Sequence, residues 1–299
     1  MDEKTLRQEV VDTGIDLLEE GLVARTWGNV SRRTDVTHFL ITPSGRDYKN
    51  TKPEELALYD IQNKTYEGPL KPSSEKGIHA AAYEIFPEAG MVIHTHQTYA
   101  SAFGVVGFDR LKMTEEERKS LGGIGEASYG LPGTGKLKKA VRKCFENGCH
   151  TVLMKHHGAV VVGEDREDAM KKILLLEEIC KRNYKGHNTE EKAAVAFSRL
   201  GIPLKAQLDD MAQMIGRKIP VVEGEPEKAL LKCPAVIVPN KGIYVKGKDS
   251  GDTEALKILV EKAAVTALHS RECKEVKTLG FLDCLLMYEV YQRKYSKKK

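Results

Sequence analysis

Three histidines in this sequence of 299 residues have the spacing of a metal site. His94 and His96 stand two residues apart in the run 91–96, which predicts a strand, and alternate side chains of a strand share a face. A third ligand must come from elsewhere, and His157 follows another apolar run and precedes Gly158, which permits a tight turn. Three imidazoles leave one coordination position open, as a catalytic zinc site requires. We therefore predict that His94, His96 and His157 bind Zn²⁺ or another divalent cation.

Two other histidines have a simpler interpretation. A pair of histidines on a strand can also be exposed, or hydrogen-bonded in the core, so the spacing alone is weak evidence. His156 adjoins His157 and should face the other way. His79 lies one helical turn after Glu75, where it could stand behind the site. Both stay outside the predicted ligand set.

Glu75 follows two serines at a predicted helix start, Pro72-Ser73-Ser74-Glu75. Ser73 as a helix cap would explain the serines without any ligand. The functional alternative is that exposed N–H groups and hydroxyls bind an anion there. Gly28-Asn29 and Ser44-Gly45 are similar small, polar pairs, and each alone is typical of a turn.

The segment 130–137 nearly matches the P-loop that binds nucleotide phosphates. It fails at the position where serine or threonine must bind magnesium, because Leu137 has no side-chain oxygen. A helix that begins after a glycine turn is a sufficient explanation.

Helices and strands that would position these residues follow one another in a mixed α/β order. Periodic apolar residues predict helices, and short apolar runs between turns predict strands. The expected helices are 4–20, 75–86, 98–104, 135–145 and 166–184, and the expected strands are 39–41, 56–59, 91–96, 152–154 and 159–162. Antiparallel pairing is expected.

The last hundred residues contain a weak echo of an earlier segment. Residues 152–165 and 236–249 share a strand, turn and strand order, and a long helix is predicted after each, the second over 252–268. The second copy has Lys241 where the first has His157, so a repeat there would have no metal site. Duplication and chance similarity both remain open.

Composition is that of an ordinary globular protein, with 41% hydrophobic and 30% charged residues. The charged N-terminus lacks the apolar stretch of a signal peptide, and no apolar run is long enough for a membrane span. Six scattered cysteines without a CxxC pair indicate reduced thiols in a cytoplasm. The net charge of +4 includes a terminal run of three lysines, which is typical of a solvated chain end and does not predict nucleic-acid binding.

Five short motifs occur in order: Gly28-Asn29-Val30-Ser31, Ile41-Thr42-Pro43-Ser44-Gly45, Pro72-Ser73-Ser74-Glu75, His94-Thr95-His96 and His156-His157-Gly158. Together they resemble the class II aldolase/adducin family, most closely its fuculose-1-phosphate aldolases. The similarity covers roughly residues 5–190, and five motifs in the right order are far more specific than any one of them.

This resemblance implies an α/β fold in which residues 1–200 form a three-layer α/β/α domain with a mainly antiparallel central sheet. Residues 201–299 would form a smaller α/β extension, with a degenerate partial repeat as one interpretation. The resemblance also implies that His94, His96 and His157 bind zinc and that Glu75 moves the proton at the reacting carbon. A substrate phosphate would be held by Gly28, Asn29, Ser44, Gly45, Ser73 and Ser74.

The implied activity is a zinc-dependent retro-aldol cleavage of a ketose 1-phosphate, fuculose- or rhamnulose-like, to dihydroxyacetone phosphate and an aldehyde. Cleavage leaves an enediolate, and its negative oxygen needs a fixed positive charge. A sugar-phosphate 4-epimerase or a thiosugar-phosphate dehydratase on the same scaffold is the alternative. A non-catalytic adducin-like module is a second alternative, but it would be expected to lose the metal ligands and Glu75.

This sequence departs from the pattern in two places. Fuculose-phosphate enzymes take a second proton carrier, a tyrosine, from a neighbouring subunit, but residues 112–119 contain no tyrosine and Tyr129 is a candidate only by proximity. Second, the C-terminal hundred residues extend beyond a minimal aldolase subunit. We expect their deletion to change assembly and leave zinc bound. The family implies a homo-oligomer, a tetramer, without membrane or nucleic-acid partners.

Overall fold

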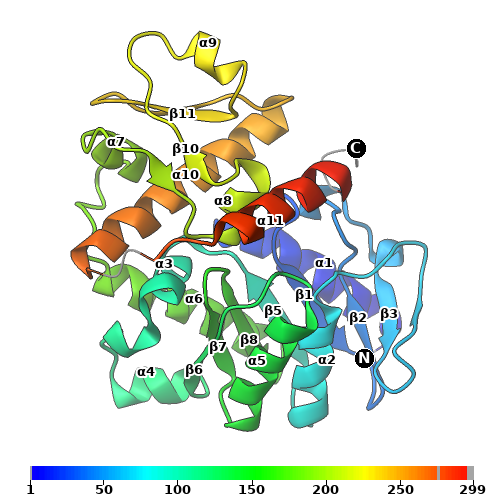
Figure 1. Cartoon of the computed structure of the whole chain (residues 1–299). Coiled ribbons are helices and arrows are strands. Elements are labelled where there is room, and N and C mark those ends of the chain that lie inside the picture. Colours follow the sequence, from blue (N-terminus) through cyan, green and yellow to red (C-terminus); the bar gives the residue numbers. More distant parts are fainter. Residues whose placement is uncertain (1, 275–276, 295–299) are drawn as a thin grey trace.

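A mixed sheet of eight strands forms the centre of the first two hundred residues in the computed structural model, which describes residues 2–274 and 277–294 (Figure 1). The strand order is β4-β3-β2-β1-β5-β8-β7-β6, and every neighbouring pair is antiparallel except β6 with β7. The strands are β1 (Asn29–Arg33), β2 (His38–Ile41), β3 (Ala57–Asp60), β4 (Tyr66–Glu67), β5 (Met91–Thr95), β6 (Ile124–Ala127), β7 (Thr151–Met154) and β8 (Ala159–Gly163). The predicted strands are all present.

Helices cover both faces of this sheet, which confirms the three-layer α/β/α prediction. The apolar sides of α1 (Glu3–Glu19), α3 (Thr98–Val106) and α6 (Arg166–Asn183) share one buried cluster with one face of the sheet. The other face packs against α2 (Lys76–Ile85) and α5 (Gly135–Glu146). Because central strands are covered on both sides, β5, β7 and β8 are buried throughout, as their continuous apolar runs predict. The short α4 (Glu115–Ser120) lies before β6.

The extension that follows α6 packs against α3 and against the turn between β7 and β8 (Figure 1). Its elements are α7 (Ala193–Ser198), β9 (Leu204–Lys205), α8 (Asp209–Met214), β10 (Lys218–Ile219), α9 (Glu227–Leu230), β11 (Ala235–Val238), β12 (Gly242–Val245), α10 (Ser250–Glu272) and α11 (Phe281–Lys294). It has its own apolar cluster, and Trp27, Tyr99 and Leu131 of the preceding domain pack against that cluster. The extension therefore has a core of its own and contacts the first domain through apolar side chains.

The β7–β8 and β11–β12 hairpins have several features in common. Both are antiparallel, and both turns contain a residue at φ 62°, His156 in the first and Asn240 in the second. The helix after each begins with a capping aspartate, Asp165 or Asp249, whose side chain accepts a backbone N–H three residues on. These similarities are consistent with a repeat, and the duplication itself stays a prediction.

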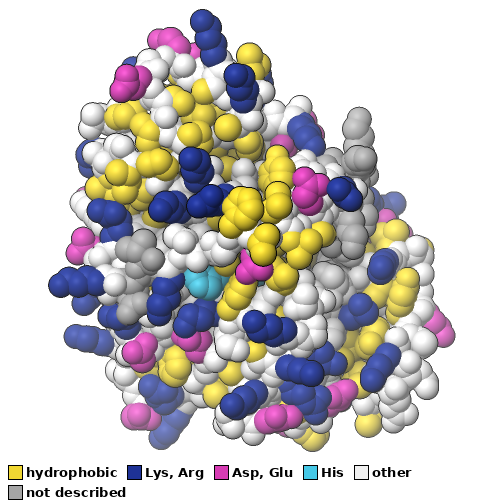
Figure 2. All heavy atoms as spheres, in the orientation of Figure 1, with side chains coloured by type: hydrophobic (Ala, Val, Ile, Leu, Met, Phe, Trp, Pro, Cys, Tyr) yellow, Lys and Arg dark blue, Asp and Glu magenta, His cyan; other side chains and the backbone are white. Residues whose placement is uncertain are grey.

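Helix α11 leaves part of its apolar side in solvent. Figure 2 shows apolar side chains gathered along this helix, and those most exposed are Phe281, Leu282, Leu285 and Leu286. None of the helices in the described residues is long and apolar enough to cross a membrane.

Candidate metal centre and active site

The three predicted ligands meet at the end of β5. His94 lies on β5, His96 directly follows it, and His157 lies in the turn between β7 and β8. Because β8 pairs with β5, with Thr95 opposite Ala159, this turn reaches the same end of the sheet. His94 Nε2 lies 3.1 Å from His96 Nε2, and one ring nitrogen from each histidine lies within 4.8 Å of the others. Three nitrogens at this separation can surround a single ion.

Each imidazole uses its other nitrogen to contact the protein. His94 Nδ1 donates to the Ala159 carbonyl at 2.8 Å, and His157 Nδ1 donates to Asp209 Oδ2. His96 Nδ1 lies 3.5 Å from Asp210 Oδ2, which is too poorly aligned for a good hydrogen bond. The Nε2 atoms therefore face the common centre.

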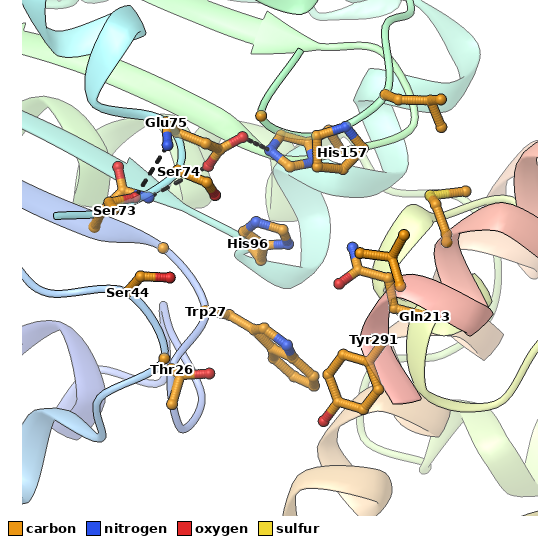
Figure 3. Close-up of a pocket in the computed structure, with 18 of the residues that line it drawn as sticks. Thr26, Trp27, Ser44, Ser73, Ser74, Glu75, His96, His157, Gln213 and Tyr291 are labelled. Carbon is orange, nitrogen blue, oxygen red and sulfur yellow. Dashed lines mark hydrogen bonds and ion pairs between the residues drawn. The ribbon is translucent and has the colours of Figure 1, made fainter. Parts of the chain in front are cut away.

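The Glu75 carboxylate faces the same centre (Figure 3). Its Oε2 lies 3.1 Å from His94 Nε2, and its Oε1 lies 3.1 Å from His157 Nε2. Although Glu75 Oε1 and His157 Nε2 are close, both atoms are buried and neither has an aligned hydrogen-bond partner in the described part of the chain. Buried polar atoms are normally paired, so their convergence fits a divalent cation between them.

Charge in this cluster favours a metal. Burial disfavours the ionised carboxylate, but His94 and His157 lower the pKa of Glu75 well below its usual range. Burial also opposes a charged His157, while Asp209 and Glu75 raise its pKa well above its usual range. Burial and His157 lower the pKa of His96 to about 4, so this ring is a neutral ligand at pH 7. A cation entering the centre would replace the proton on His157.

A directional chain of hydrogen bonds ends on Glu75. Burial is the main reason that the pKa of His79 falls to about 3, so this histidine is neutral. Its Nδ1 accepts from Ser31 Oγ at 2.6 Å, and its Nε2–H donates to Asn29 Oδ1 at 2.5 Å. Asn29 Nδ2 in turn donates to Glu75 Oε2 at 3.3 Å. His79 thus stands behind the site and fixes the Asn29 amide, while His156 faces away and donates from Nδ1 to the Gln207 carbonyl.

The six residues expected to hold a phosphate lie together. They line one cavity of about 360 Å³, which Glu75, His96 and His157 also line. The six residues are Gly28, Asn29, Ser44, Gly45, Ser73 and Ser74. Ser73 Oγ accepts from the Glu75 backbone N–H at 3.2 Å, but α2 begins at Lys76 with Glu75 as its N-cap, so Ser73 is not the helix cap considered above. Gly28 has φ 79°, and a Cβ there would lie 2.4 Å from the His94 carbonyl oxygen. Glycine is therefore needed where this loop meets β5.

The opposite wall of the cavity was missed by sequence reasoning. It contains Trp27 and Leu131 from the first domain and, from the extension, Gln213 of α8 and four residues of α11: Leu286, Met287, Val290 and Tyr291. In Figure 3 the Gln213 amide points into the cavity, whereas the Tyr291 hydroxyl points away from His96. The sequence offered one signal for this wall: its single tryptophan, Trp27, directly precedes the Gly28-Asn29 motif.

Tyr129, the tyrosine considered as a second proton carrier, is not among the residues that line this cavity. Its ring packs at 90° against His156, and its buried hydroxyl has no hydrogen-bond partner among the described residues. Burial and the nearby Asp283 raise the pKa of Tyr129. Neither its position nor its pKa supports proton transfer at the centre.

Comparison with known families gives the same result as the motifs. Residues 8–184 match the family described as the Class II Aldolase and Adducin N-terminal domain. The chain belongs to this family. The match ends one residue after α6, so the extension lies outside it.

The relatives of this class II aldolase family member include proteins named as epimerases and proteins named as aldolases. The L-ribulose-5-phosphate 4-epimerase UlaF of Salmonella paratyphi C is 32% identical over 199 residues, covering 59% of this chain and 82% of that protein. A solved L-fuculose 1-phosphate aldolase is 28% identical with a TM-score of 0.55, over 60% of this chain and 84% of that one. YgbL from Klebsiella pneumoniae is 25% identical with a TM-score of 0.58, over 63% and 93%. The predicted family and fold are therefore correct.

Proposed function

We propose that this protein is a divalent-metal aldolase that cleaves a ketose 1-phosphate to dihydroxyacetone phosphate and an aldehyde. The observation that carries the proposal is the convergence of three imidazole Nε2 atoms and the Glu75 carboxylate on one point of a cavity. The same cavity has a serine-rich end suited to a phosphate. All four chemical groups are retained, which argues against a non-catalytic adducin-like module.

In this proposal the three histidines hold the ion and Glu75 moves the proton. A divalent cation would supply a fixed positive charge for the oxygens that become negative as the carbon–carbon bond breaks. Glu75 would accept and return the proton at the reacting carbon, since it is the carboxylate beside the centre. The Asn29 amide, fixed by His79, would hold Glu75 Oε2 in place. Zinc is the cation that three histidines and an open position favour.

Phosphate would bind at the serine-rich end of the cavity. Ser44, Ser73 and Ser74 place hydroxyl groups there, and α2 begins directly after Glu75. Hydroxyls and unpaired N–H groups at a helix start are good donors to a phosphate. Binding there would orient the ketose with its carbonyl toward the histidines.

The far wall of the cavity favours aldol cleavage as the net reaction. Trp27, Leu131, Met287 and Val290 are apolar, and the described residues that line this wall offer no charge to a second phosphate-bearing fragment. A 1-phosphate substrate releases an unphosphorylated aldehyde, which suits such a wall. A 5-phosphate substrate of an epimerase would instead carry its phosphate on the aldehyde fragment.

A 4-epimerase is the second candidate, and the 32% identity to an L-ribulose-5-phosphate 4-epimerase favours it. It would use the same cleavage and then re-add the aldehyde from the other side. The histidines and Glu75 serve both reactions, so the products must distinguish them.

The test is product analysis with ketose 1-phosphates and ketose 5-phosphates, comparing the metal-loaded native protein with Glu75→Gln. Release of dihydroxyacetone phosphate from a 1-phosphate, reduced about 10²- to 10⁴-fold in the variant, would support the aldolase. Inversion at C4 of a 5-phosphate without release of fragments would support the epimerase. If the metal-loaded native protein catalyses neither reaction with any substrate tested, that result would count against both the aldolase and the epimerase proposal.

A further inference from the structure

Helix α8 of the extension begins against the metal centre. Its first two residues, Asp209 and Asp210, are 1% and 0% exposed. The Asp209 backbone N–H donates to the His156 carbonyl at 3.0 Å, which ties the start of α8 to the turn that carries His157. The extension therefore contacts the ligand-bearing turn through main chain as well as side chains.

Asp209 holds the His157 ring from the side opposite the centre. Its Oδ2 accepts from His157 Nδ1, and His157 Nε2 then faces Glu75 and the common centre of the three histidines. A hydrogen bond at Nδ1 selects the tautomer with its lone pair on Nε2 and fixes the ring's orientation. Carboxylates in this position are the usual partners of metal-binding histidines, and they also make the imidazole a stronger ligand.

Asp210 and Lys262 fix α8 beside the ligands. Lys262 of α10 is 2% exposed, and its Nζ donates to Asp210 Oδ2 and, at 3.1 Å, to the His96 carbonyl. Although His96, Asp209 and Asp210 could together approach a second ion, the ammonium group of Lys262 already occupies the side of Asp210. The two aspartates are therefore better explained as partners of the histidines than as ligands of another metal.

The charges around the centre support the same view. The carboxylates of Glu75, Asp209 and Asp210 contact the histidines, and in the part of the chain that the structure describes one ammonium group, that of Lys262, pairs with them. With the three histidines neutral, as they would be as ligands, this leaves a surplus of two negative charges in a buried cluster, where uncompensated charge is costly. A single divalent ion at the histidines would balance it.

We propose that the extension contributes to the metal centre. Its Asp209 is a positioning residue that orients the His157 ring so that Nε2 can bind the ion. The proposal rests on the assignment of the three histidines as ligands. It also reverses the expectation that deletion of the last hundred residues would leave zinc binding intact. The test of this proposal measures metal affinity in the absence of substrate. Its outcome is therefore independent of whether the protein is an aldolase.

The first experiment measures zinc affinity of the full chain by competition with a chromophoric chelator. We expect Asp209→Asn to bind zinc about 10- to 100-fold more weakly than the native protein, because a neutral amide replaces the charged partner of His157. Ser270→Ala is the matched control, since it removes a buried hydrogen bond to Gln207 in the extension and Ser270 makes no hydrogen bond to His94, His96 or His157. The thermal midpoints of both metal-free variants show whether each remains folded. Equal zinc affinity of native protein and a folded Asp209→Asn would overturn the proposal.

A second measurement needs no variant. In zinc-loaded native protein with ¹⁵N-labelled histidine, NMR should show the Nδ1 of His157 carrying a slowly exchanging proton, with Nε2 unprotonated. A His157 ring with its proton on Nε2, or with Nδ1 bound to the ion, would contradict the role of Asp209. The tautomer reports that His157 binds through Nε2, and the slow exchange of the Nδ1 proton reports its hydrogen bond to Asp209.

Discussion

Each imidazole of the centre has one nitrogen directed at a protein group and one directed at the common centre. The protein groups come from three different sources: the Ala159 carbonyl, Asp209 and, less directly, Asp210. Sequence spacing could predict the histidines and Glu75, because short motifs preserve their order. It could not predict Asp209, because two adjacent acidic residues before a helix are usually explained by the helix dipole.

At this scale, adjacent histidines provide a matched pair of variants. We expect His157→Ala to lose zinc, because two remaining imidazoles cannot complete the site. His156→Asn should retain zinc, because His156 faces the Gln207 carbonyl and asparagine tolerates its φ of 62°, as Asn240 does in the second hairpin. Metal analysis after dialysis checks both. Zinc retained by His157→Ala, or lost from a folded His156→Asn, would contradict the assigned ligands.

Among the elements, the strands could be predicted well and the extension poorly. Continuous apolar runs identify β5, β7 and β8, and their burial follows from helices on both faces. Helix α10 was expected as 252–268 and extends from Ser250 to Glu272. The contribution of α8 and α11 to the cavity was not foreseen. It depends on long-range packing, which local periodicity does not encode.

The turn between β7 and β8 gives a prediction at this scale. A Cβ at Gly158 would lie 2.1 Å from the Thr95 carbonyl oxygen, so Gly158→Ala must push the His157 turn away from the end of β5. We expect it to lower the free energy of unfolding by about 1–3 kcal/mol and to weaken zinc binding. Gly135→Ala, at the first residue of α5 with open space around it, should be neutral or slightly stabilising. Urea unfolding and zinc titration of both variants measure this, and equal behaviour of the two would refute the close-packing argument.

In the whole molecule, the extension and the family domain share buried contacts and one cavity. The family match ends at residue 184, and the domain boundary expected near residue 200 stays a prediction. The two parts are in contact, because α10 packs on α3 and α11 lines the cavity. The homotetramer implied by the family stays a prediction. Composition could exclude broad classes of protein, but it could not reveal that one wall of the cavity comes from the C-terminal extension.

His269 connects the two parts and should make this junction sensitive to acid. Its ring in α10 lies 4.5 Å from that of Phe103 in α3, and its Nδ1 accepts the Lys185 backbone N–H at 3.3 Å. Burial, followed by Lys185 and Arg110, lowers the pKa of His269 from 6.5 to about 4. Between pH 6.5 and about 4, His269 therefore takes up a proton in the unfolded chain but stays neutral in the folded protein. Stability from this group is present above pH 6.5 and is lost as the pH falls toward about 4.

The comparison that isolates this effect is with His269→Gln, which can still accept the Lys185 N–H. We expect the native protein to have the larger free energy of unfolding at pH 7 and this advantage to shrink at pH 5. Urea unfolding at the two pH values measures it. An advantage that stays constant or grows on acidification would contradict a neutral, buried His269.

The most direct test of the account is whether Glu75 moves a carbon-bound proton beside the ion. Zinc-loaded protein is incubated with dihydroxyacetone phosphate in D₂O, and exchange of the carbon-bound hydrogens is followed by proton NMR. The account predicts exchange of one hydrogen by the native protein, with little or none after chelation of zinc or in a zinc-loaded Glu75→Gln. No exchange by the zinc-loaded native protein, or equal exchange by Glu75→Gln, would contradict it.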